Sequence, residues 1–329
     1  MDGTRAGRAM KPKKSAPRAL ARLFMLALLA AFLLAAAGFA WLLWAAGPPR
    51  PPGVAGDGRR PGFFTFLIVG LNEGANANTV MVASLDGASG EAHLISIPRD
   101  SLLNVSRGNR KLSSSYMVGA GGGRGAEGGV RQMQAEVSAL VGFVPDFYVV
   151  IDYDAFFAII DAVGGIEVYV PMRMRYTDPS QDLRIDIQPG LQHMDSRTAL
   201  DFARFRQADP GYPSPPRSDY FRIESQQAVV AAVLERMLRP ASIPRIPEFA
   251  RIFDESVRTD LTAGNLTWLA QRMWRGGGVT AHTMPTSGTS GPPRWYEIID
   301  AQRALELVNG TVNPFLRDIR PDELDIVSE

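Results

Sequence analysis

The sequence predicts an α/β fold in which helices cover a largely buried sheet. Short apolar runs, too brief for helices, alternate with longer segments of helical spacing. No internal repeat and no second linker interrupts this alternation over residues 63–316. The composition is that of a globular protein, with 46% hydrophobic and 21% charged residues among 329. We therefore expect one folded domain with its own hydrophobic core over this range.

The first 46 residues do not fit that domain. Residues 1–22 hold seven basic residues against one acid, and residues 23–46 form an apolar run without a charge. About 20 apolar residues suffice to span a membrane, and Trp41 and Trp44 stand at the far end of the run, where interfacial aromatic residues occur. We expect a cytoplasmic basic tail (1–22) and an uncleaved anchor (23–46), with the rest of the chain outside the membrane.

A cleaved signal peptide, processed near Ala35 to Gly38, is the alternative interpretation of the apolar run. It is disfavoured because the apolar core of a signal peptide has only about 7–15 residues. Residues 47–62 are rich in proline and glycine and predict an extended stalk before the domain. Residues 317–329 are expected to form a C-terminal tail.

The predicted strands begin with FFTFLIVGL, residues 63–71, which is rich in strand-forming residues. DGASG at residues 86–90 is a hairpin signal between two further strands, at 79–85 and 91–98. Later strands are expected at residues 147–153, 166–171 and 279–285.

The predicted helices are separated from these strands by glycines and capping residues. The one over 154–165 is expected to begin at Asp154 as its cap and to end at Gly164 and Gly165. The stretch 119–129 is glycine-rich, lacks the ending of a nucleotide-binding P-loop, and predicts a flexible loop. The other helices are expected at residues 130–142, 221–239, 265–274 and 300–309.

Charge and composition exclude several classes of function. The net charge of +1 does not indicate a nucleic-acid binder. With no cysteine, the chain has neither disulfides nor thiolate metal ligands. Its three histidines lie far apart in sequence, so the chain lacks the paired spacing of a histidine zinc site.

Arginines and acids recur where predicted elements end. Arg99 and Asp100 follow a strand, and Asp219 stands three residues before Arg222 at the start of the longest helix. For each of these side chains alone, an ion pair or a helix cap is the favoured explanation, because both are common. With Arg204 and Arg206 counted, however, four arginines come from three segments, and the guanidinium fork suits phosphate oxygens. The set predicts binding of a pyrophosphate or phosphodiester.

Five motifs give a resemblance to a known family. They occur in the order SIPRD, KLSSSY, GGIEVYVP, IQPGLQHMDSRTALDFARFR and SDYFRIESQQ. From Phe66 to Asn313 the chain resembles the LytR-CpsA-Psr family, whose members transfer cell-envelope glycopolymers from a polyprenyl-pyrophosphate carrier to peptidoglycan through a phosphodiester. The resemblance implies an α-β-α sandwich with a central mixed sheet, and a long apolar pocket for the lipid tail.

The resemblance also implies roles for particular residues. Arg99 would face the donor pyrophosphate while Asp100 holds the turn. Asp219 would either orient an arginine or activate the acceptor hydroxyl. The expected catalytic residues are Arg99, Arg204, Arg206, Asp219 and Arg222, and the expected substrate-binding residues are Asp100, Lys111 and Gln226.

The chain departs from the family pattern after the first strand. There the family has aspartates that hold Mg²⁺ on the pyrophosphate, whereas this chain has Asn72 and Asn78 in GLNEGANANTV. An amide oxygen ligates Mg²⁺ without contributing charge, and Glu73 is displaced by one residue from the expected spacing. The expected metal ligands are Asn72 and Asn78. Two other departures are Ser225, where arginine is common, and an insert at 207–217, expected to form a lid or rim.

The leading hypothesis is a membrane-anchored, single-pass phosphotransferase whose partners are the lipid-linked glycan, peptidoglycan and the membrane. The alternative is a non-catalytic envelope protein that binds lipid-linked glycan, which the two asparagines favour. Transcriptional regulation is a third class. It is disfavoured because an extracytoplasmic domain does not reach nucleic acid and no basic recognition helix is present.

Overall fold

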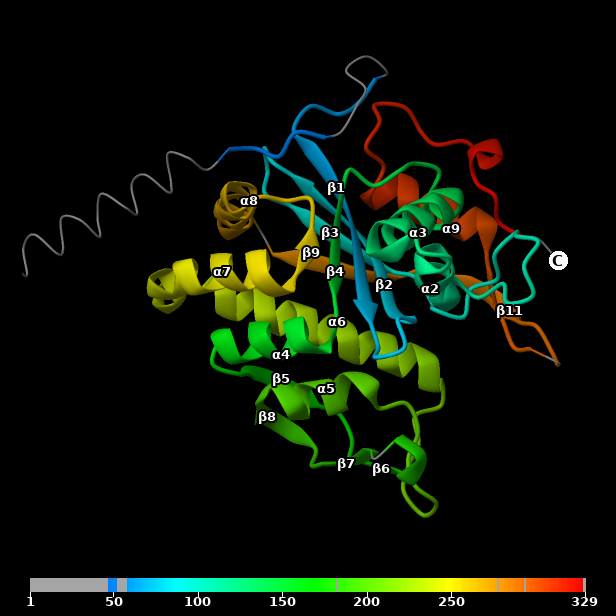
Figure 1. Cartoon of the computed structure of the whole chain (residues 1–329), viewed down its shortest axis with the longest axis vertical. Coiled ribbons are helices and arrows are strands. Elements are labelled where there is room, and N and C mark those ends of the chain that lie inside the picture. The colour runs from blue at the N-terminus through cyan, green and yellow to red at the C-terminus, as the bar shows by residue number, and fades with distance from the viewer. Residues whose placement is uncertain (1–46, 52–57, 182, 277, 293, 328–329) are drawn as a thin grey trace, which may run out of the picture. The chain divides into compact units, whose positions relative to one another are not determined.

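The computed structural model describes residues 47–51, 58–181, 183–276, 278–292 and 294–327 (Figure 1). The expected cytoplasmic tail and membrane anchor lie outside these residues. Within the described part of the chain, no helix has the length and apolarity that crossing a bilayer requires.

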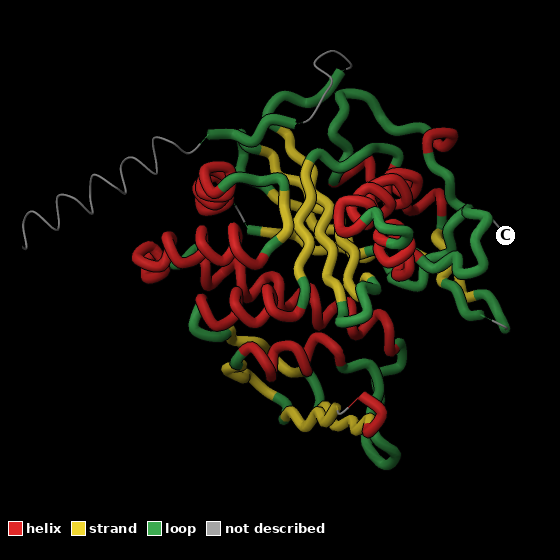
Figure 2. Tube along the Cα trace, viewed as in Figure 1, coloured by secondary structure: helices red, strands yellow, loops and turns green. Residues whose placement is uncertain are grey.

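A six-stranded mixed sheet forms the centre of the domain (Figure 2). Its strand order is β10-β3-β2-β1-β4-β9. β1, β2 and β3 form an antiparallel meander, while the β1–β4 and β3–β10 pairs are parallel. The expected α/β fold with a central mixed sheet is therefore confirmed. The strands are β1 (Phe63–Leu71), β2 (Ala77–Asp86), β3 (Ala92–Ser96), β4 (Phe147–Ile151), β9 (Arg258–Thr259) and β10 (Val279–Thr283).

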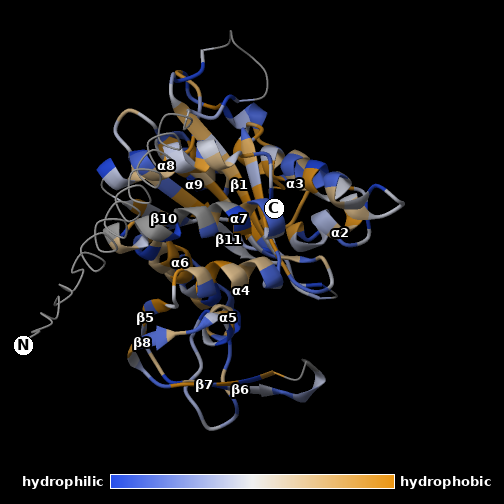
Figure 3. Cartoon of the chain, turned by 60° about the vertical axis from the view of Figure 1, so that its left-hand side comes forward, coloured by the Kyte–Doolittle hydropathy of each residue, from blue (hydrophilic) through white to orange (hydrophobic). Residues whose placement is uncertain are grey.

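Helices cover both faces of this sheet, as the alternation of its side chains requires. Leu67 and Val69 of β1 pack in one core with α2 (Ser115–Ala120), α3 (Gly125–Val141) and α9 (Ala301–Thr311). Phe64 and Phe66 point to the opposite face and pack against α8 (Ala263–Arg275). Figure 3 shows the strands of the sheet mainly in the colours of hydrophobic residues.

A second hydrophobic core lies beside α6 (Ser218–Met237), the longest helix in the described residues. Ile160, Ile166, Phe202 and Val229 are buried in it. Several of its elements are not predicted from the sequence, because segments of five to eleven residues give short signals. The elements around this core are α4 (Tyr153–Ala162), β5 (Ile166–Val170), β6 (Met174–Asp178), β7 (Leu183–Ile187), β8 (Gly190–Met194), α5 (Ser196–Arg204) and α7 (Ile246–Ser256). The last two strands are β11 (Thr286–Thr289) and β12 (Glu297–Ile299).

The expectation of a flexible glycine-rich loop over 119–129 is wrong, because α3 begins inside it at Gly125. Gly119 of α2 and Gly128 of α3 lie backbone to backbone, and a Cβ on either would collide with the other helix. These glycines permit close helix packing, and the turn between the helices is confined to residues 121–124.

The expected cap of the helix after β4 is also misplaced by two residues. Asp152, and not Asp154, is the N-cap of α4, and its Oδ1 accepts a hydrogen bond of 2.9 Å from the backbone N–H of Ala155. Asp154 lies in the first turn, where a carboxylate is also favourable beside the free N–H groups. Two acids at this spacing give the same sequence signal.

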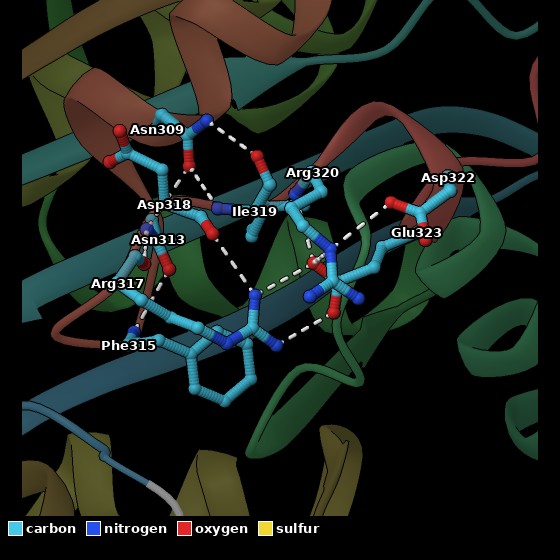
Figure 4. A network of polar contacts seen from close by, with 9 residues as sticks. All are labelled: Asn309, Asn313, Phe315, Arg317, Asp318, Ile319, Arg320, Asp322 and Glu323. Carbon is cyan, nitrogen blue, oxygen red and sulfur yellow. Dashed lines mark hydrogen bonds and ion pairs between the residues drawn. The ribbon is translucent and has the colours of Figure 1, made fainter.

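The C-terminal segment folds back onto the domain (Figure 4). Oδ1 of Asn309 in α9 accepts a hydrogen bond of 2.8 Å from the backbone N–H of Ile319, whose side chain is buried. Arg317 forms an ion pair of 2.7 Å with Glu323, and hydrogen bonds from Arg317 and from the Arg320 backbone lower the pKa of Glu323 to about 2. Residues 317–327 were expected to form a tail. They instead pack against the core that β1 shares with α2, α3 and α9.

Two histidines at the edge of the sheet give a testable pH dependence. Nδ1 of His93 on β3 lies 3.3 Å from Nε2 of His282 on β10. Burial, with a smaller effect of His93, lowers the pKa of His282 below its ordinary 6.5. The folded state disfavours protonation of the His282 ring, whereas the unfolded chain takes up the proton near pH 6.5. The contribution of His282 to the free energy of unfolding is therefore complete above pH 6.5 and is lost as the pH falls below 6.5.

We therefore expect the urea midpoint of His282→Gln to fall less than that of the wild type between about pH 7.5 and about pH 5.5. Comparing the two proteins removes the effect of carboxylates that titrate in both. Equal slopes of midpoint against pH would contradict the assignment.

Candidate functional site

The candidate site forms where several strands of the central sheet end. Leu71 at the end of β1 pairs with Ala77 at the start of β2. Ser96 at the end of β3 pairs with Thr283 at the end of β10. The turn that begins at Asn72 and the loop containing Arg99 therefore leave the same end of the sheet, and one hydrogen bond joins Arg99 to Asn78, the second residue of β2.

Arg99 is held in position by its backbone and its side chain. Its carbonyl accepts a hydrogen bond of 2.8 Å from the N–H of Ser113, and Ser101 closes the turn through a 3.0 Å bond to the Pro98 carbonyl. Nη1 of Arg99 donates to Oδ1 of Asn78 at 2.7 Å. Its Nε is buried and has no hydrogen-bond partner among the described residues. A buried guanidinium N–H without a partner is costly unless a ligand oxygen completes it.

Arg222 is the most buried arginine of the expected site, with only 5% of its surface exposed. Its Nη2 lies 2.8 Å from Oδ1 of Asp219, in the first turn of α6. Burial, followed by the positive charge of Arg99, lowers the pKa of Arg222 to about 10, and Arg206 adds to the shift. Asp219 and Asp100 oppose it. The guanidinium therefore remains protonated at neutral pH.

This electrostatic coupling shows that three of the expected arginines lie together. Arg99 and Arg206 each repel Arg222, and the Nε of Arg222, like that of Arg99, is buried without a partner among the described residues. An anion with several oxygens would satisfy both free N–H groups and reduce the repulsion. The arrangement therefore suits a phosphate or pyrophosphate.

Lys111 and Asp100 form the next layer of charge. Nζ of Lys111 lies 3.1 Å from Oδ1 of Asp100, and each side chain is about one quarter exposed. Lys111 precedes the 3₁₀ turn η1 (Leu112–Ser114), and a β-bridge to Leu102 fixes its backbone. The structure thus brings two of the three expected substrate-binding residues, Asp100 and Lys111, beside Arg99.

Arg204 and Arg206 stand at the end of α5, separated by the fully buried Phe205. Arg206 is exposed and acts electrostatically on Arg222. The Arg204 guanidinium lies 5.8 Å from the ring centroid of Tyr153, the residue that opens α4. The two arginines therefore have different surroundings, and Arg206 is the one coupled to the buried arginine.

Gln226 and its neighbour connect α6 to the rest of the domain. Nε2 of Gln226 donates a long 3.4 Å hydrogen bond to the Ala203 carbonyl of α5. Gln227, which the sequence analysis did not select, donates to Ser96 Oγ at 2.9 Å and to the His282 carbonyl at 2.8 Å. Its bonds anchor α6 at the strand ends, so Gln227 positions the helix that carries Asp219 and Arg222.

The insert at 207–217 is tied to β6. Asp209 accepts hydrogen bonds from the backbone N–H of Thr177 at 2.8 Å and from its hydroxyl at 3.1 Å. The Asp209 N–H in turn donates to the Arg175 carbonyl. A lid role for the insert stays a prediction.

A small, wholly apolar pocket lies in the second core, lined by Ile159, Met237, Phe249, Ile252 and Phe253.

The asparagines do not fit the Mg²⁺ site that the resemblance implies. Oδ1 of Asn72 accepts hydrogen bonds from the backbone N–H groups of Gly74 and Asn76, at 3.1 Å and 2.9 Å. Oδ1 of Asn78 is engaged by Arg99, and Glu73 is exposed. Within the described residues, no three histidine, aspartate or glutamate side chains are grouped to hold a metal. Mg²⁺ prefers charged oxygens, and here the amide oxygens serve the protein's own turn and arginine.

We expect the Asn72→Asp and Asn78→Asp double variant to bind Mg²⁺ more tightly than the wild type, because it supplies two charged oxygens. Isothermal titration with MgCl₂ measures both affinities. Single variants separate the two positions. Equal affinity of wild type and double variant would mean that this turn is not where a metal would bind.

One further carboxylate near these residues was missed. Glu297 on β12 has a raised pKa, chiefly through burial and then through the negative charge of Asp219, with Asp100 adding to it. Tyr220 of α6 is hydrogen-bonded to Thr286 of β11, which lies beside the same carboxylate. Glu297 belongs to no motif recognised in the sequence. It lies near the site because its segment pairs with Ser101, which is distant in sequence.

Comparison with known proteins gives consistent matches. The model of the LytR_cpsA_psr family matches residues 53–311. A Bacillus subtilis (strain 168) protein named polyisoprenyl-teichoic acid–peptidoglycan teichoic acid transferase TagV is 27% identical over 209 residues, 60% of this chain and 50% of TagV. The corresponding transferase TagU of the same organism is 24% identical over 234 residues, 69% of each chain.

The fold also matches a solved structure. The crystal structure of B. subtilis TagV superposes with a TM-score of 0.62 at 23% identity, over 76% of this chain and 96% of that chain. This similarity shows a common fold. The chain spans about half the length of the full TagV sequence.

Proposed function

Because the chain belongs to the LytR-CpsA-Psr family, we propose that it is a phosphotransferase that moves a glycopolymer from a polyprenyl-pyrophosphate carrier to peptidoglycan. The names of TagV and TagU, which describe transfer of teichoic acid to peptidoglycan, support this proposal. The observation that carries it is the group of Arg99, Arg206 and Arg222, with two buried Nε groups that lack a protein partner among the described residues.

In the proposed reaction, an acceptor hydroxyl attacks the phosphorus next to the glycan, and polyprenyl phosphate leaves. The pyrophosphate carries negative charge that grows on the bridging oxygen as the bond breaks, and fixed cations lower the energy of that state. Arg99 and Arg222 would supply the fixed donors, because their positions are set by Asn78 and Asp219. No step is assigned to a metal, since the amide oxygens of the turn are already engaged.

We place the protein in the cell membrane as a single-pass protein, with its N-terminus in the cytoplasm. The apolar run of residues 23–46 and the basic residues before it support this placement. An anchor would keep the domain near a donor whose lipid is itself in the membrane.

The test uses the full chain in detergent, a polyprenyl-pyrophosphate-linked glycan and a peptidoglycan oligomer. Mass spectrometry follows polyprenyl phosphate and the phosphodiester-linked product, with and without EDTA. Acceptor-dependent formation of both products is the expected result. Tight donor binding without either product would instead support the non-catalytic, glycan-binding alternative.

A further inference from the structure

β12 places Glu297 directly beside the loop that follows Arg99. The N–H of Glu297 donates to the Asp100 carbonyl at 2.9 Å, and the Glu297 carbonyl accepts from the N–H of Leu102 at 2.9 Å. These bonds form a parallel bridge centred on Ser101. The backbone of Glu297 is thus fixed two residues from the arginine expected to face the pyrophosphate.

The Glu297 side chain is partly buried among groups from three elements. Asp219 and Arg217 approach from the start of α6, Thr286 from β11, and Asp100 from the loop after β3. Burial, followed by the negative charge of Asp219 and then of Asp100, raises the pKa of the Glu297 carboxyl, whereas the Thr286 hydroxyl and the positive charge of Arg217 lower it. The net result is a pKa above the ordinary 4.5.

The two neighbouring aspartates are each engaged in an ion pair. Asp219 is paired with Arg222 at 2.8 Å, and Asp100 is paired with Lys111 at 3.1 Å. Among the described residues, no cation lies within ion-pair distance of Glu297, so its oxygens are not committed in this way.

We propose that Glu297 is the general base of transfer and accepts the proton of the acceptor hydroxyl, an inference that rests on the proposed function. The acceptor oxygen forms its bond to the glycan-side phosphorus while the bond from that phosphorus to the bridging oxygen breaks. The bridging oxygen and its electron pair leave with polyprenyl phosphate. The hydroxyl proton passes to the Glu297 carboxylate, which afterwards releases it to water.

This assignment divides the site between two substrates. In this proposal Arg99 and Arg222 bind the donor, while Glu297, which lies beside Asp100 and Asp219, acts on the acceptor. A base is most effective when its pKa approaches the working pH, and the surroundings of Glu297 shift its pKa in that direction.

The test compares Glu297→Gln with the wild-type full chain in the transfer assay. We expect kcat to fall by about 10²–10⁴-fold, the usual contribution of a general base, with donor affinity unchanged. In the wild type, kcat should decline towards acid pH with an apparent pKa above 4.5. In Glu297→Gln that decline should disappear from the residual rate.

Glu297→Asp keeps the carboxylate and should recover part of the rate together with the acid decline, which a purely structural role would not produce. If Glu297→Gln does not fold, Glu297→Ala is measured in its place, and a folded Glu297→Ala protein with the wild-type rate and acid decline would overturn the proposal. Glu306→Gln, on the exposed side of α9, is the matched control and should transfer normally.

The outcomes separate this proposal from the proposed function. Normal transfer by folded Glu297→Gln would overturn the base assignment and leave the proposed function standing. An unchanged pH profile in that variant would do the same. Absence of transfer by the wild type, with donor and acceptor both present, would overturn both.

Discussion

Replacing Arg99 with alanine should lower transfer by about 10²–10³-fold, the usual effect of removing one fixed donor to a developing negative charge. The side chain donates 2.7 Å to Asn78 and presents a buried Nε that has no partner among the described residues. Alanine removes the donor and also removes one of the positive charges that repel Arg222. The fold should therefore survive the change, and the loss should appear in catalysis and donor binding.

The measurement is kcat/KM for transfer, with thermal unfolding followed by circular dichroism. Arg131→Ala is the matched control, because Arg131 is an exposed arginine on α3, a helix that contributes no residue to the candidate site. Normal transfer by a folded Arg99→Ala protein would remove Arg99 from the pyrophosphate site.

Arg222→Lys should cost about as much, roughly 10²-fold or more, although it preserves the charge. The arginine fork contacts Asp219 through Nη2 while its buried Nε stays free for a second acceptor. A lysine has one nitrogen on a flexible stem. It does not donate hydrogen bonds both toward Asp219 and toward a second acceptor in the way that the arginine fork does. Its smaller head also loses packing in a position that is only 5% exposed.

Thermal unfolding of Arg222→Lys is measured alongside transfer, because a protein that does not fold would also lose transfer. Asp219→Asn provides a second probe, since it keeps the shape of the acid and weakens the hold on Arg222. Both variants should bind the donor more weakly than the wild type. A folded Arg222→Lys protein with wild-type kcat/KM would show that the fork geometry is not needed.

The central sheet could be predicted because its strands are buried and bounded by turn residues. β1 is almost wholly apolar, and DGASG marks the following hairpin. The elements around the second core were harder to find. β7 is LRIDI, whose Arg184 and Asp186 point outward in strict alternation, a pattern that five residues express only weakly. The glycines of α3 were predicted to form a loop. Glycine is typical both of flexible loops and of closely packed helices, so its presence alone does not distinguish the two.

The site divides in a similar way. Arg99, Asp219 and Arg222 are recognisable from local motifs, and the structure brings Arg99 and Arg222 into electrostatic contact. The engagement of Asn78 by Arg99 depends on tertiary structure, and so does the position of Glu297. Neither is expressed in the spacing of nearby residues, so sequence periodicity does not reveal them.

The connectivity of the sheet has a consequence for how the chain acquires its structure during synthesis. β1, β2 and β3 follow one another closely and can pair early, but the outer edge of β3 is covered by β10, where Ala92 pairs with Val279. Contacts between such distant residues form late because closing a long loop is entropically costly. Until β10 has been translated, β3 presents open backbone groups to other chains. Ile319 joins the core later still, so a polypeptide translated only as far as β10 still lacks a buried part of its core.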